Sequence, residues 1–477
     1  MNTKLLRQKI LDLAIRGKLT DQRKSDGTAR ELLEQISASC HPEQSSKSAK
    51  SKNLTPITPL DKSEAPFEIP DNWEWVHLQD VGELSRGKSK HRPRNDPALY
   101  VDGFMPFVQT GDVAGAEKGL ICKWHSLYNE LGVAQSRIWP RGTICITIAA
   151  NIGDVALLNF DACFPDSVVG FNAYKPIYSN KFFLFYLMLC KEKLDEKSRS
   201  TAQKNINIDI LSQIYVPLPP LAEQQRIVEK IEEAFAEIDA VEKNKELLKK
   251  HIKQTRKKIL DLAIHGKLVP QDENDEPASV LLERITRDNP HYEKLTDIPF
   301  EIPDSWEWVK LGNIGKWQSG TTPSKSNSSY YKDGTIPWLN TGDLNDGIIR
   351  EIPKKVTEKA LAETSLRLNE AGSVCIAMYG ATIGKIGILS MPATTNQACC
   401  VCNNLKNFVN QMWLFYFLKN HKQEFIEAGF GGAQPNISKE KITATPFPLP
   451  PLAEQKRIVN KIDEIFASLD EISLHLV

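Results

Sequence analysis

The sequence predicts an α+β protein in which two similar, pseudo-symmetric globular domains are joined by long antiparallel coiled-coil helices. Three observations predict this fold class. An apolar seam of helical period lies in the middle of the chain, two long segments repeat each other, and the end of the seam matches the N-terminus of the chain. Together they indicate a chain built from two related halves.

The central helix is predicted to run over Pro220–Leu268. Apolar residues recur every third or fourth position over Ile227–Leu262, with two polar breaks at Lys245 and Thr255, which is the period of a coiled coil. Gly266 follows the seam where a helix C-cap favours glycine, and Pro219 and Pro220 precede the first turn, where a missing N–H costs nothing. A helix of about 45 residues is roughly 70 Å long. We therefore expect it to pack against a partner helix, and the seam disfavours a solvated linker helix.

The globular domains are predicted from an internal repeat. Pro66–Trp75 returns almost unchanged as Pro299–Trp308, and Pro217–Gln224 returns without a change as Pro448–Gln455. Each copy opens on a Trp-rich strand, contains apolar runs broken by glycines, and closes with one aromatic helix, at Asn180–Lys193 in the first copy. The second aromatic helix is expected at 410–425. The repeat therefore consists of two copies of a whole α+β domain.

The repeat is also circular. Lys9–Leu19 matches the end of the central helix, Lys258–Leu268, and Pro451–Val477 resembles its start. If the two chain ends lie together, they form a second long helical element, related to the first by a pseudo-twofold axis. The seam of both elements is predicted at Ile227, Ile231, Ile238, Val241, Leu248, Ile252, Ile259, Ile458, Ile462, Ile465, Leu469 and Ile472.

Charge complementarity predicts that these helices pair antiparallel. Glu223–Glu242 carries an excess of acids and would face the basic N-terminal helix, and the basic half, Lys243–Lys258, would face Glu454–Glu471. The basic residues of the N-terminal helix are Lys4, Arg7, Lys9, Arg16 and Lys18.

These patterns divide the chain into seven segments. We expect an N-terminal helical segment that completes the second spacer helix (1–36), a flexible linker (37–65), the first globular domain (66–218), the central spacer helix (219–268), a connector (269–298), the second globular domain (299–449) and the C-terminal spacer helix (450–477).

Composition sets limits on location and partners. The 477 residues are 41% hydrophobic and 25% charged, and the formal net charge is zero, so a nucleic-acid surface has to be local. The N-terminus does not read as a signal peptide, and the longest apolar runs, Phe182–Cys190 and Met412–Leu418, are too short to span a bilayer. Nine cysteines without a framework fit a reducing compartment. We expect a cytoplasmic protein that does not enter a membrane.

The chemical motifs do not predict catalysis or a metal site. Gly82–Ser89 matches G-x-x-x-x-G-K-[ST], but prolines follow where a helix has to open, and the second copy, Gly315–Thr322, lacks the lysine. Cys399, Cys400 and Cys402 are better explained by a buried strand than by a metal site, because the first copy has no cysteines there.

Two loops in equivalent places are the predicted DNA-binding surface. Arg86–Arg94 carries five positive charges and no acid, which suits phosphate neutralisation and hydrogen bonds to base edges, while Gly320–Lys332 is less charged and rich in donors and acceptors. A solvated charged loop remains an alternative for the first. The candidate DNA-binding residues are Arg86, Lys88, Lys90, His91, Arg92, Arg94, Lys204, Asn205, Thr321, Thr322, Lys325, Asn327, Tyr330 and Lys332.

The whole chain resembles the DNA-specificity subunit of type I restriction-modification enzymes. The resemblance is carried by the P-L-P-P-L-A-E-Q-x-R-I-V segments at Pro217–Val228 and Pro448–Val459, by the I-P-x-x-W-E-W openings at Ile69–Trp75 and Ile302–Trp308, and by G-A-T-I-G at Gly380–Gly384. The first copy departs from the last motif.

The resemblance implies a non-catalytic subunit with two target-recognition domains, each reading one half of a split, asymmetric site in double-stranded DNA. It further implies that the helices set the gap between the half-sites and dock two modification subunits, which carry S-adenosylmethionine and methylate adenine. Two restriction subunits, using ATP and magnesium, would add cleavage.

Two other hypotheses remain open on the sequence alone. The chain could be a two-headed scaffold that presents similar modules to proteins without binding DNA. It could also be a stand-alone ATP-dependent enzyme, a hypothesis that rests only on Gly82–Ser89.

Overall fold

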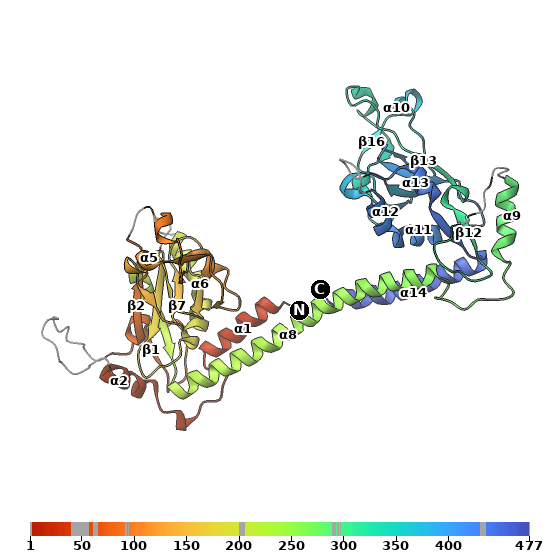
Figure 1. Cartoon of the computed structure of the whole chain (residues 1–477). Coiled ribbons are helices and arrows are strands. Elements are labelled where there is room, and N and C mark those ends of the chain that lie inside the picture. The colour runs from red at the N-terminus through yellow and green to blue at the C-terminus, as the bar shows by residue number, and fades with distance from the viewer. Residues whose placement is uncertain are drawn as a thin grey trace. The chain divides into compact units, whose positions relative to one another are not determined.

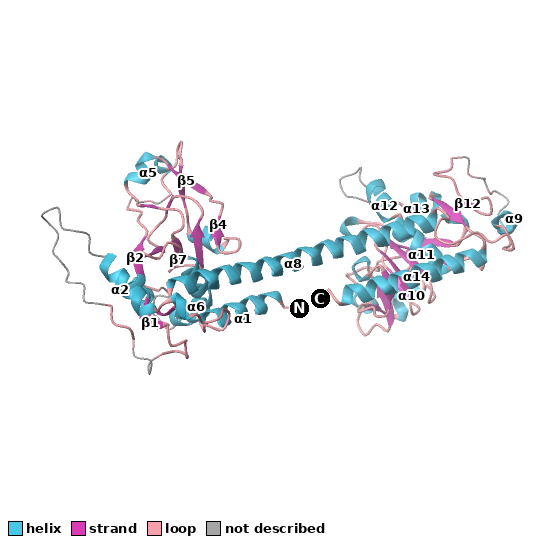
Figure 2. Ribbon diagram, turned by 90° about the horizontal axis from the view of Figure 1, so that it is seen from below, coloured by secondary structure: helices cyan, strands magenta, loops and turns pink. Residues whose placement is uncertain are grey.

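The computed structural model describes residues 2–39, 57–60, 65–90, 93, 95–199, 206–288, 292, 295, 297–429 and 436–476. It divides into two compact units, Met1–Asn244 and Lys245–Val477, with the boundary inside the long helix α8 (Leu221–Ile264). Each unit contains, in the same order, a spacer segment, a short second helix, a sheet-containing domain and a second spacer segment (Figures 1 and 2). Two domains of mixed helix and sheet with one long helix confirm the predicted fold class.

The helical elements of unit 1 up to α8 are α1 (Thr3–Ile15), η1 (Lys24–Asp26), α2 (Ala29–Ser39), α3 (Leu78–Val81), η3 (Pro97–Leu99), α4 (Thr110–Ala114), α5 (Glu130–Ala134), α6 (Lys181–Arg199) and α7 (Ile208–Ser212). Those of unit 2 after α8 are α9 (Ala278–Asp288), η4 (Leu311–Asn313), η5 (Ser328–Tyr330), η6 (Thr341–Asp343), α10 (Glu358–Glu363), η7 (Gly380–Thr382), α11 (Gln411–Asn420), α12 (Lys422–Gly429), α13 (Lys439–Ala444) and α14 (Leu452–Leu474).

The sheets of the two units correspond strand for strand over most of their extent. In unit 1, β1 (Glu74–His77) pairs with β11 (Tyr215–Leu218). The five-stranded sheet has the strand order β2 (Gly82–Arg86), β10 (Val168–Ala173), β7 (Ile144–Thr147), β8 (Val155–Leu158), β4 (Leu120–Ile121). The four-stranded sheet has the strand order β5 (Ser126–Tyr128), β3 (Met105–Phe107), β9 (Ala162–Cys163), β6 (Ile138–Trp139). In unit 2, β12 (Glu307–Lys310) pairs with β21 (Pro446–Leu449). The five-stranded sheet has the strand order β13 (Lys316–Ser319), β20 (Cys399–Asn403), β17 (Val374–Ala377), β18 (Ile386–Leu389), β15 (Gly347–Ile349). The three-stranded sheet has the strand order β16 (Lys355–Val356), β14 (Ile336–Leu339), β19 (Thr394–Thr395).

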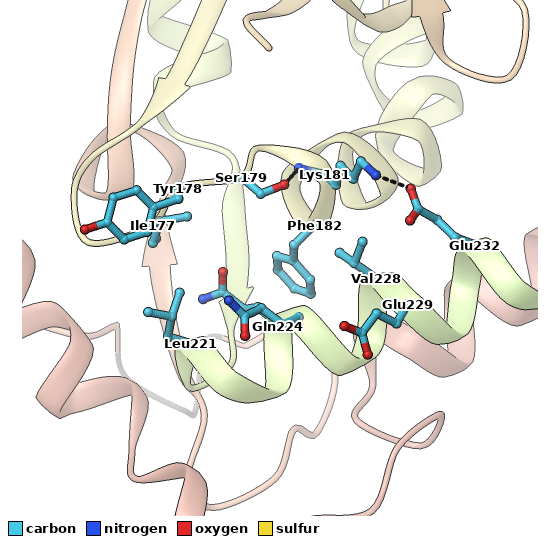
Figure 3. Close-up of a pocket in the computed structure, with 11 residues that line it drawn as sticks. Ile177, Tyr178, Ser179, Lys181, Phe182, Leu221, Gln224, Val228, Glu229 and Glu232 are labelled. Carbon is cyan, nitrogen blue, oxygen red and sulfur yellow. Dashed lines mark hydrogen bonds and ion pairs between the residues drawn. The ribbon is translucent and has the colours of Figure 1, made fainter.

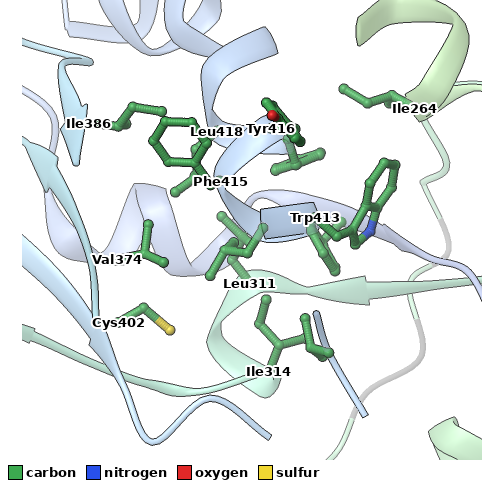
Figure 4. Packing of buried hydrophobic residues seen from close by; sticks show 14 of the residues in the cluster. Ile264, Leu311, Ile314, Val374, Ile386, Cys402, Trp413, Phe415, Tyr416 and Leu418 are labelled. Carbon is green, nitrogen blue, oxygen red and sulfur yellow. The ribbon is translucent and has the colours of Figure 1, made fainter. Parts of the chain in front are cut away.

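Each aromatic helix packs on the large sheet of its domain. Figure 4 shows Trp413 and Phe415 of α11 with Leu311, Val374 and Cys402 in the core of unit 2, where all five are buried. In the first domain the expected helix is α6. In the second domain, the single helix expected at 410–425 is wrong, because α11 and α12 are separate helices with His421 between them.

The ends of the spacer helices follow their sequence signals. Helix α8 begins directly after Pro220, and Gly266 has φ of +67°, a value that glycine adopts readily. The N–H of Lys267 donates to Leu262 O at 2.8 Å and that of Gly266 to Ala263 O at 3.1 Å, which is the Schellman pattern. Lys18 repeats this contact at the end of α1, on Leu13 O at 2.9 Å. The predicted glycine cap is confirmed.

The spacer segments pair antiparallel within each unit. In unit 1, Nη2 of Arg7 on α1 contacts Oδ1 of Asp239 on α8 at 2.5 Å, and the guanidinium lies 4.9 Å from the ring centroid of Phe235. In unit 2, Nη2 of Arg256 contacts Oδ1 of Asp470 on α14 at 2.6 Å. The predicted charge pairing is thus present at these positions, whereas Arg16 pairs instead with Asp12 of its own helix at 2.9 Å.

The predicted seam is only partly buried. Its members Ile227, Ile231, Ile238, Ile252, Ile458 and Ile462 are buried, and Ile259, Ile465 and Leu469 are half-buried. Val241, Leu248 and Ile472 are 47%, 39% and 44% exposed, and their membership of the seam stays a prediction. These residues lie near the beginning of α1 and the end of α14, where the partner helix of each pair stops. That the chain ends together complete a second long helix stays a prediction.

The linker expected at 37–65 falls mostly outside the described residues, and its first residues, 37–39, are the last turn of α2. Among the described helices, none combines the length and the apolar character that a membrane crossing requires.

Candidate nucleic-acid interface

The first candidate loop leaves the edge strand β2 of the five-stranded sheet. Arg86, Lys88 and Lys90 are exposed, while the intervening Gly87 and Ser89 are buried. Because side chains of an extended segment alternate between its two faces, three cations lie on its outer face. His91, Arg92, Arg94, Lys204 and Asn205 lie outside the described residues.

The backbone of this loop is held by hydrogen bonds to the domain. The N–H of Lys88 donates to Phe164 O at 2.9 Å, and Ser136 Oγ donates to Lys88 O at 2.6 Å. The N–H of Lys90 donates to Gln135 Oε1 at 2.5 Å. These bonds use only the backbone atoms of Lys88 and Lys90. They fix the position of the backbone from which the two lysine side chains extend.

Two tyrosines, Tyr128 and Tyr100, lie beneath the loop with their ring centroids 5.3 Å apart. Ser89 Oγ is 3.3 Å from the hydroxyl of Tyr128, which is fully buried. Burial, and after it the neighbouring Tyr128, raises the pKa of Tyr100 to about 12. A tyrosine hydroxyl is uncharged at neutral pH even at its ordinary pKa of about 10, so Tyr100 does not offset the cations on the outer side of the loop.

The second candidate loop leaves β13 at the equivalent place. The N–H of Thr321 donates to Thr395 O at 2.9 Å, its Oγ1 lies 3.0 Å from Ser365 Oγ, and Thr322 Oγ1 donates to Gln397 Oε1. Lys325 and Lys332 are exposed. This loop presents hydroxyl and amide groups with only two lysines, in contrast to the cationic first loop.

Two of the predicted residues in this loop also support its shape. Asn327 Oδ1 accepts from the N–H of Ser329 at 3.2 Å and so caps η5, and the Tyr330 hydroxyl donates to Glu363 Oε2 at 3.2 Å. Among the predicted residues of this loop, Lys325 and Lys332 are exposed, and Thr321, Thr322, Asn327 and Tyr330 are half-buried.

One glycine at the start of each loop shows that the loops are equivalent. A Cβ on Gly87 would lie 2.3 Å from Phe164 O, and a Cβ on Gly320 would lie 2.2 Å from Thr395 O. Any side chain here would clash with backbone, so glycine is required in both copies. The two loops thus leave the same corner of the fold and differ in chemistry.

The sheet register shows which residues of the two copies are equivalent around Asp166. Phe107 pairs with Cys163 in parallel register, and Trp338 pairs with Thr394 in the second unit. This makes Pro165 equivalent to Asn396 and Asp166 equivalent to Gln397, whereas alignment of the two sequences alone matches Pro165 and Asp166 with Thr395 and Asn396. The error arises because the intervening strands share few identical residues.

The T-G-D segments of the two copies and the cysteines of β20 have structural roles. Asp112 Oδ2 accepts from the N–H of Gln109 at 2.8 Å, and Asp343 Oδ2 accepts from the N–H of Asn340 at 2.8 Å, so an aspartate side chain holds the equivalent turn in each copy. Cys399, Cys400 and Cys402 lie in the fully buried strand β20. Burial raises the pKa of Cys402 to about 12, so this thiol stays protonated at neutral pH.

A pocket of about 430 Å³ lies away from the loops, between the first domain and the start of α8 (Figure 3). Phe182 and Val228 line it, and Lys181 Nζ contacts Glu232 Oε1 at 2.5 Å. Gln224 donates to Pro219 O there, and its counterpart Gln455 donates in the same way to Pro450 O. Gln455 also donates to Phe408 O and accepts from the N–H of Asn410. In the second unit this glutamine therefore joins the start of α14 to the segment that precedes α11.

Sequence reasoning missed the contacts that join each domain to its spacer. Trp73 Nε1 donates to Glu223 Oε2 at 2.8 Å, and Arg226 Nη2 contacts Asp26 Oδ2 at 2.6 Å. The equivalent pairs of unit 2 have the same geometry, 2.9 Å for Trp306 with Glu454 and 2.7 Å for Arg457 with Asp275. Part of the signal was available, because six of the eight residues lie in the repeated segments, and only Asp26 and Asp275 lie beyond them.

Comparison with known proteins matches this two-unit organisation. The family model described as "Type I restriction modification DNA specificity domain" matches residues 70–250 and again 303–474. The chain belongs to this family. It is 25% identical to the specificity subunit of the type I restriction enzyme EcoAI from Escherichia coli, over 98% of this chain and 90% of that protein. It is 24% identical to the putative type I restriction enzyme MjaX specificity subunit of Methanocaldococcus jannaschii, over 83% of this chain and 88% of that one.

Solved structures show the same fold. The HsdS subunit from Thermoanaerobacter tengcongensis aligns with a TM-score of 0.56 at 18% identity, over 87% of this chain and 94% of that chain. A second structure, from work titled as the structural basis of complex assembly and conformational transition of the type I R-M system, aligns with a TM-score of 0.57 at 19% identity. It covers 86% of this chain and 94% of that chain.

Proposed function

We propose that this chain is the DNA-specificity subunit of a type I restriction-modification complex and that its two target-recognition domains read the two halves of a split, asymmetric site. One observation carries the proposal. The loops that begin at Gly87 and Gly320 leave equivalent places in the two domains but differ in chemistry. The two domains can therefore bind DNA in the same way and recognise different base sequences. The family membership assigns the same role.

The target class is double-stranded DNA, and the cationic face of the first loop supports it. Arg86, Lys88 and Lys90 form a local basic surface on a chain whose formal net charge is zero. Local cations neutralise phosphates, while partner subunits can supply other parts of a DNA clamp.

The partners we propose are two modification subunits and two restriction subunits. Exposed apolar side chains on the spacer of each unit support docking of such partners: Leu5 and Val241 in unit 1, and Leu247, Leu248 and Ile472 in unit 2. In this proposal S-adenosylmethionine serves adenine methylation in the modification subunits, and ATP and magnesium serve the restriction subunits. The chain itself contributes no catalytic residue, and the complex acts in the cytoplasm.

The test is to co-express the full chain with the modification subunit encoded beside it and to map methylated adenines across the host DNA by single-molecule sequencing. The expected result is one split motif with a constant gap. A complex that forms and adds no new methylation would contradict the proposal and favour a protein-interaction scaffold.

A further inference from the structure

Arg137 and Arg367 occupy the same position in the two target-recognition domains. Trp139 pairs with Ala162, and Asn369 bridges to Ala393. Ala162 and Ala393 are equivalent, because each directly precedes a residue of the shared parallel pairing, Cys163 or Thr394. Trp139 and Asn369 are therefore equivalent. Arg137 and Arg367 each precede them by two residues, so the two arginines are equivalent as well, although the residues around them differ.

Each arginine is oriented by a side chain of the neighbouring edge strand. Arg137 Nη1 donates to Glu83 Oε1 of β2 at 2.9 Å, and its guanidinium lies 3.9 Å from the ring centroid of Trp139. Arg367 Nη1 donates to Gln318 Oε1 of β13 at 3.0 Å. Gln318 is itself held, since its Nε2 donates to the buried Asn369 at 3.0 Å.

The change of partner follows from the register of the two sheets. Glu83 lies opposite Asn172, and Lys316 lies opposite Asn403 at the equivalent place. A lysine cannot accept a hydrogen bond from a guanidinium, so in the second domain the contact moves to Gln318, which points to the same face of the strand. The arginine is thus held in both domains by different means.

Both guanidiniums can bind a further group. The Arg137 side chain is 40% exposed, and Arg367 is exposed. A guanidinium has five N–H donors, and these partners engage only Nη1. Its fixed fork of donors matches the oxygens of a phosphate.

Both arginines also adjoin the candidate loops. Gln135 and Ser136, which directly precede Arg137, bind the backbone of Lys90 and Lys88. Ser365, two residues before Arg367, bonds to Thr321, the residue that directly follows the loop glycine Gly320. Each arginine is therefore at the base of a loop that differs between the domains.

We propose that Arg137 and Arg367 each contact a backbone phosphate of the target DNA and so position the two domains on the duplex without reading sequence. The inference rests on the proposed function. A residue that is identical in both domains cannot distinguish two different half-sites, whereas loops that differ can. Phosphate contacts fix register and orientation, and base contacts specify sequence.

The experiment uses the full chain in complex with its modification subunit and a duplex that bears the motif methylated by the wild-type complex. Binding is measured between about 50 and 200 mM salt. We expect each of Arg137→Gln and Arg367→Gln to make the slope of log K against log salt shallower by about 0.9 and to leave the methylated motif unchanged. Arg137→Lys and Arg367→Lys keep the charge and should restore the slope.

Two control variants separate this contact from general charge and from folding. Arg141 is exposed in the first domain where the second has Ala371, so Arg141→Gln removes a charge of the same kind and should leave the slope unchanged. Glu83→Ala removes the partner and keeps Arg137, so the slope should be retained even if the edge of the sheet loosens.

Unchanged slopes in both glutamine variants would overturn the inference, and so would a changed methylated motif, which would make the arginines base readers. A wild-type complex that methylates no split motif would instead overturn the proposed function. The two failures are therefore distinguishable.

Discussion

Trp73 and Glu223 are 150 residues apart in the sequence, yet the indole Nε1 of Trp73 donates to Oε2 of Glu223 at 2.8 Å in the interior of unit 1. Gln22 Nε2 donates to the other carboxylate oxygen at 2.6 Å. One buried carboxylate therefore binds the target-recognition domain and the N-terminal segment to the start of the spacer helix. Trp306, Gln271 and Glu454 repeat the arrangement in unit 2.

The first prediction concerns this carboxylate. Glu454→Ala leaves the Trp306 indole and the Gln271 amide without their acceptor, and an unsatisfied buried donor costs about 1–3 kcal/mol. We expect the free energy of unfolding of unit 2 to fall by that amount in urea denaturation. Glu464→Ala, on the same helix at the exposed ion pair with Lys461, is the matched control and should change stability little. Equal effects of the two variants would contradict the prediction.

The second prediction concerns pH and Asp239. A hydrogen bond from Lys118 and, after it, one from Arg7 hold the pKa of Asp239 below its ordinary value of 3.8. Because the pKa is lower in the folded chain than in the unfolded one, this carboxylate stabilises the fold above pH 3.8 and loses that contribution as pH falls through the folded pKa. Asp239→Asn should therefore cost about 1 kcal/mol at pH 7 and progressively less below pH 3.8.

Urea unfolding at several pH values measures this effect. Lys118→Ala removes one of the two partners and should show a smaller difference from wild type with the same pH dependence. A constant difference between Asp239→Asn and wild type across the pH range would show that the carboxylate acts by packing and not by its charge.

The sequence predicted the fold class because its strongest signals are local or repeated. The seam that begins at Ile227 and the cap at Gly266 are set by helix geometry, and a domain that occurs twice reveals its own boundaries. The burial of seam residues such as Val241 was not predictable, because it depends on where the partner helix ends and not on the period of the seam itself.

The sequence marked the candidate loops but not the side chains that lie beside them. The cationic composition of the first loop marked it, and Lys88 is exposed as expected. Arg137 was missed, because its role depends on a sheet register that brings it next to the loop across a long sequence separation. Nothing in the local sequence around Arg137 distinguishes it from other exposed arginines.

The third prediction tests the glycine that begins the first loop. Gly87→Ala places a Cβ 2.3 Å from the backbone oxygens of Phe164 and Pro165, neither of which can move as a side chain would. The loop has to shift, so methylation of the host motif should fall at least tenfold. Gly111→Ala is the control, since a Cβ there has no neighbour within 4 Å. Normal methylation by the Gly87 variant would show that the loop does not contact DNA.

The fourth prediction tests the charge of that loop. Lys88→Ala and Arg92→Ala should weaken DNA binding through the first domain only, because the equivalent loop of unit 2 begins with Thr321 and depends less on charge. Binding to duplexes that carry only one half-site each, measured over a salt series, separates the two domains. Equal losses on both half-sites, or no loss on either, would place the first DNA-binding surface elsewhere.

The last prediction tests the spacer. If α8 sets the distance between the half-sites, inserting one heptad after Asn244 preserves the seam and lengthens the helix by about 10 Å, the length of about three base pairs. The methylated motif should then keep both half-sites and acquire a longer gap, by at most about three base pairs, in the same adenine-mapping experiment. Both domains fold from residues outside the insertion, so their base preferences have no physical reason to change. Altered half-sites with an unchanged gap would show that the helix joins the domains without setting their spacing on DNA.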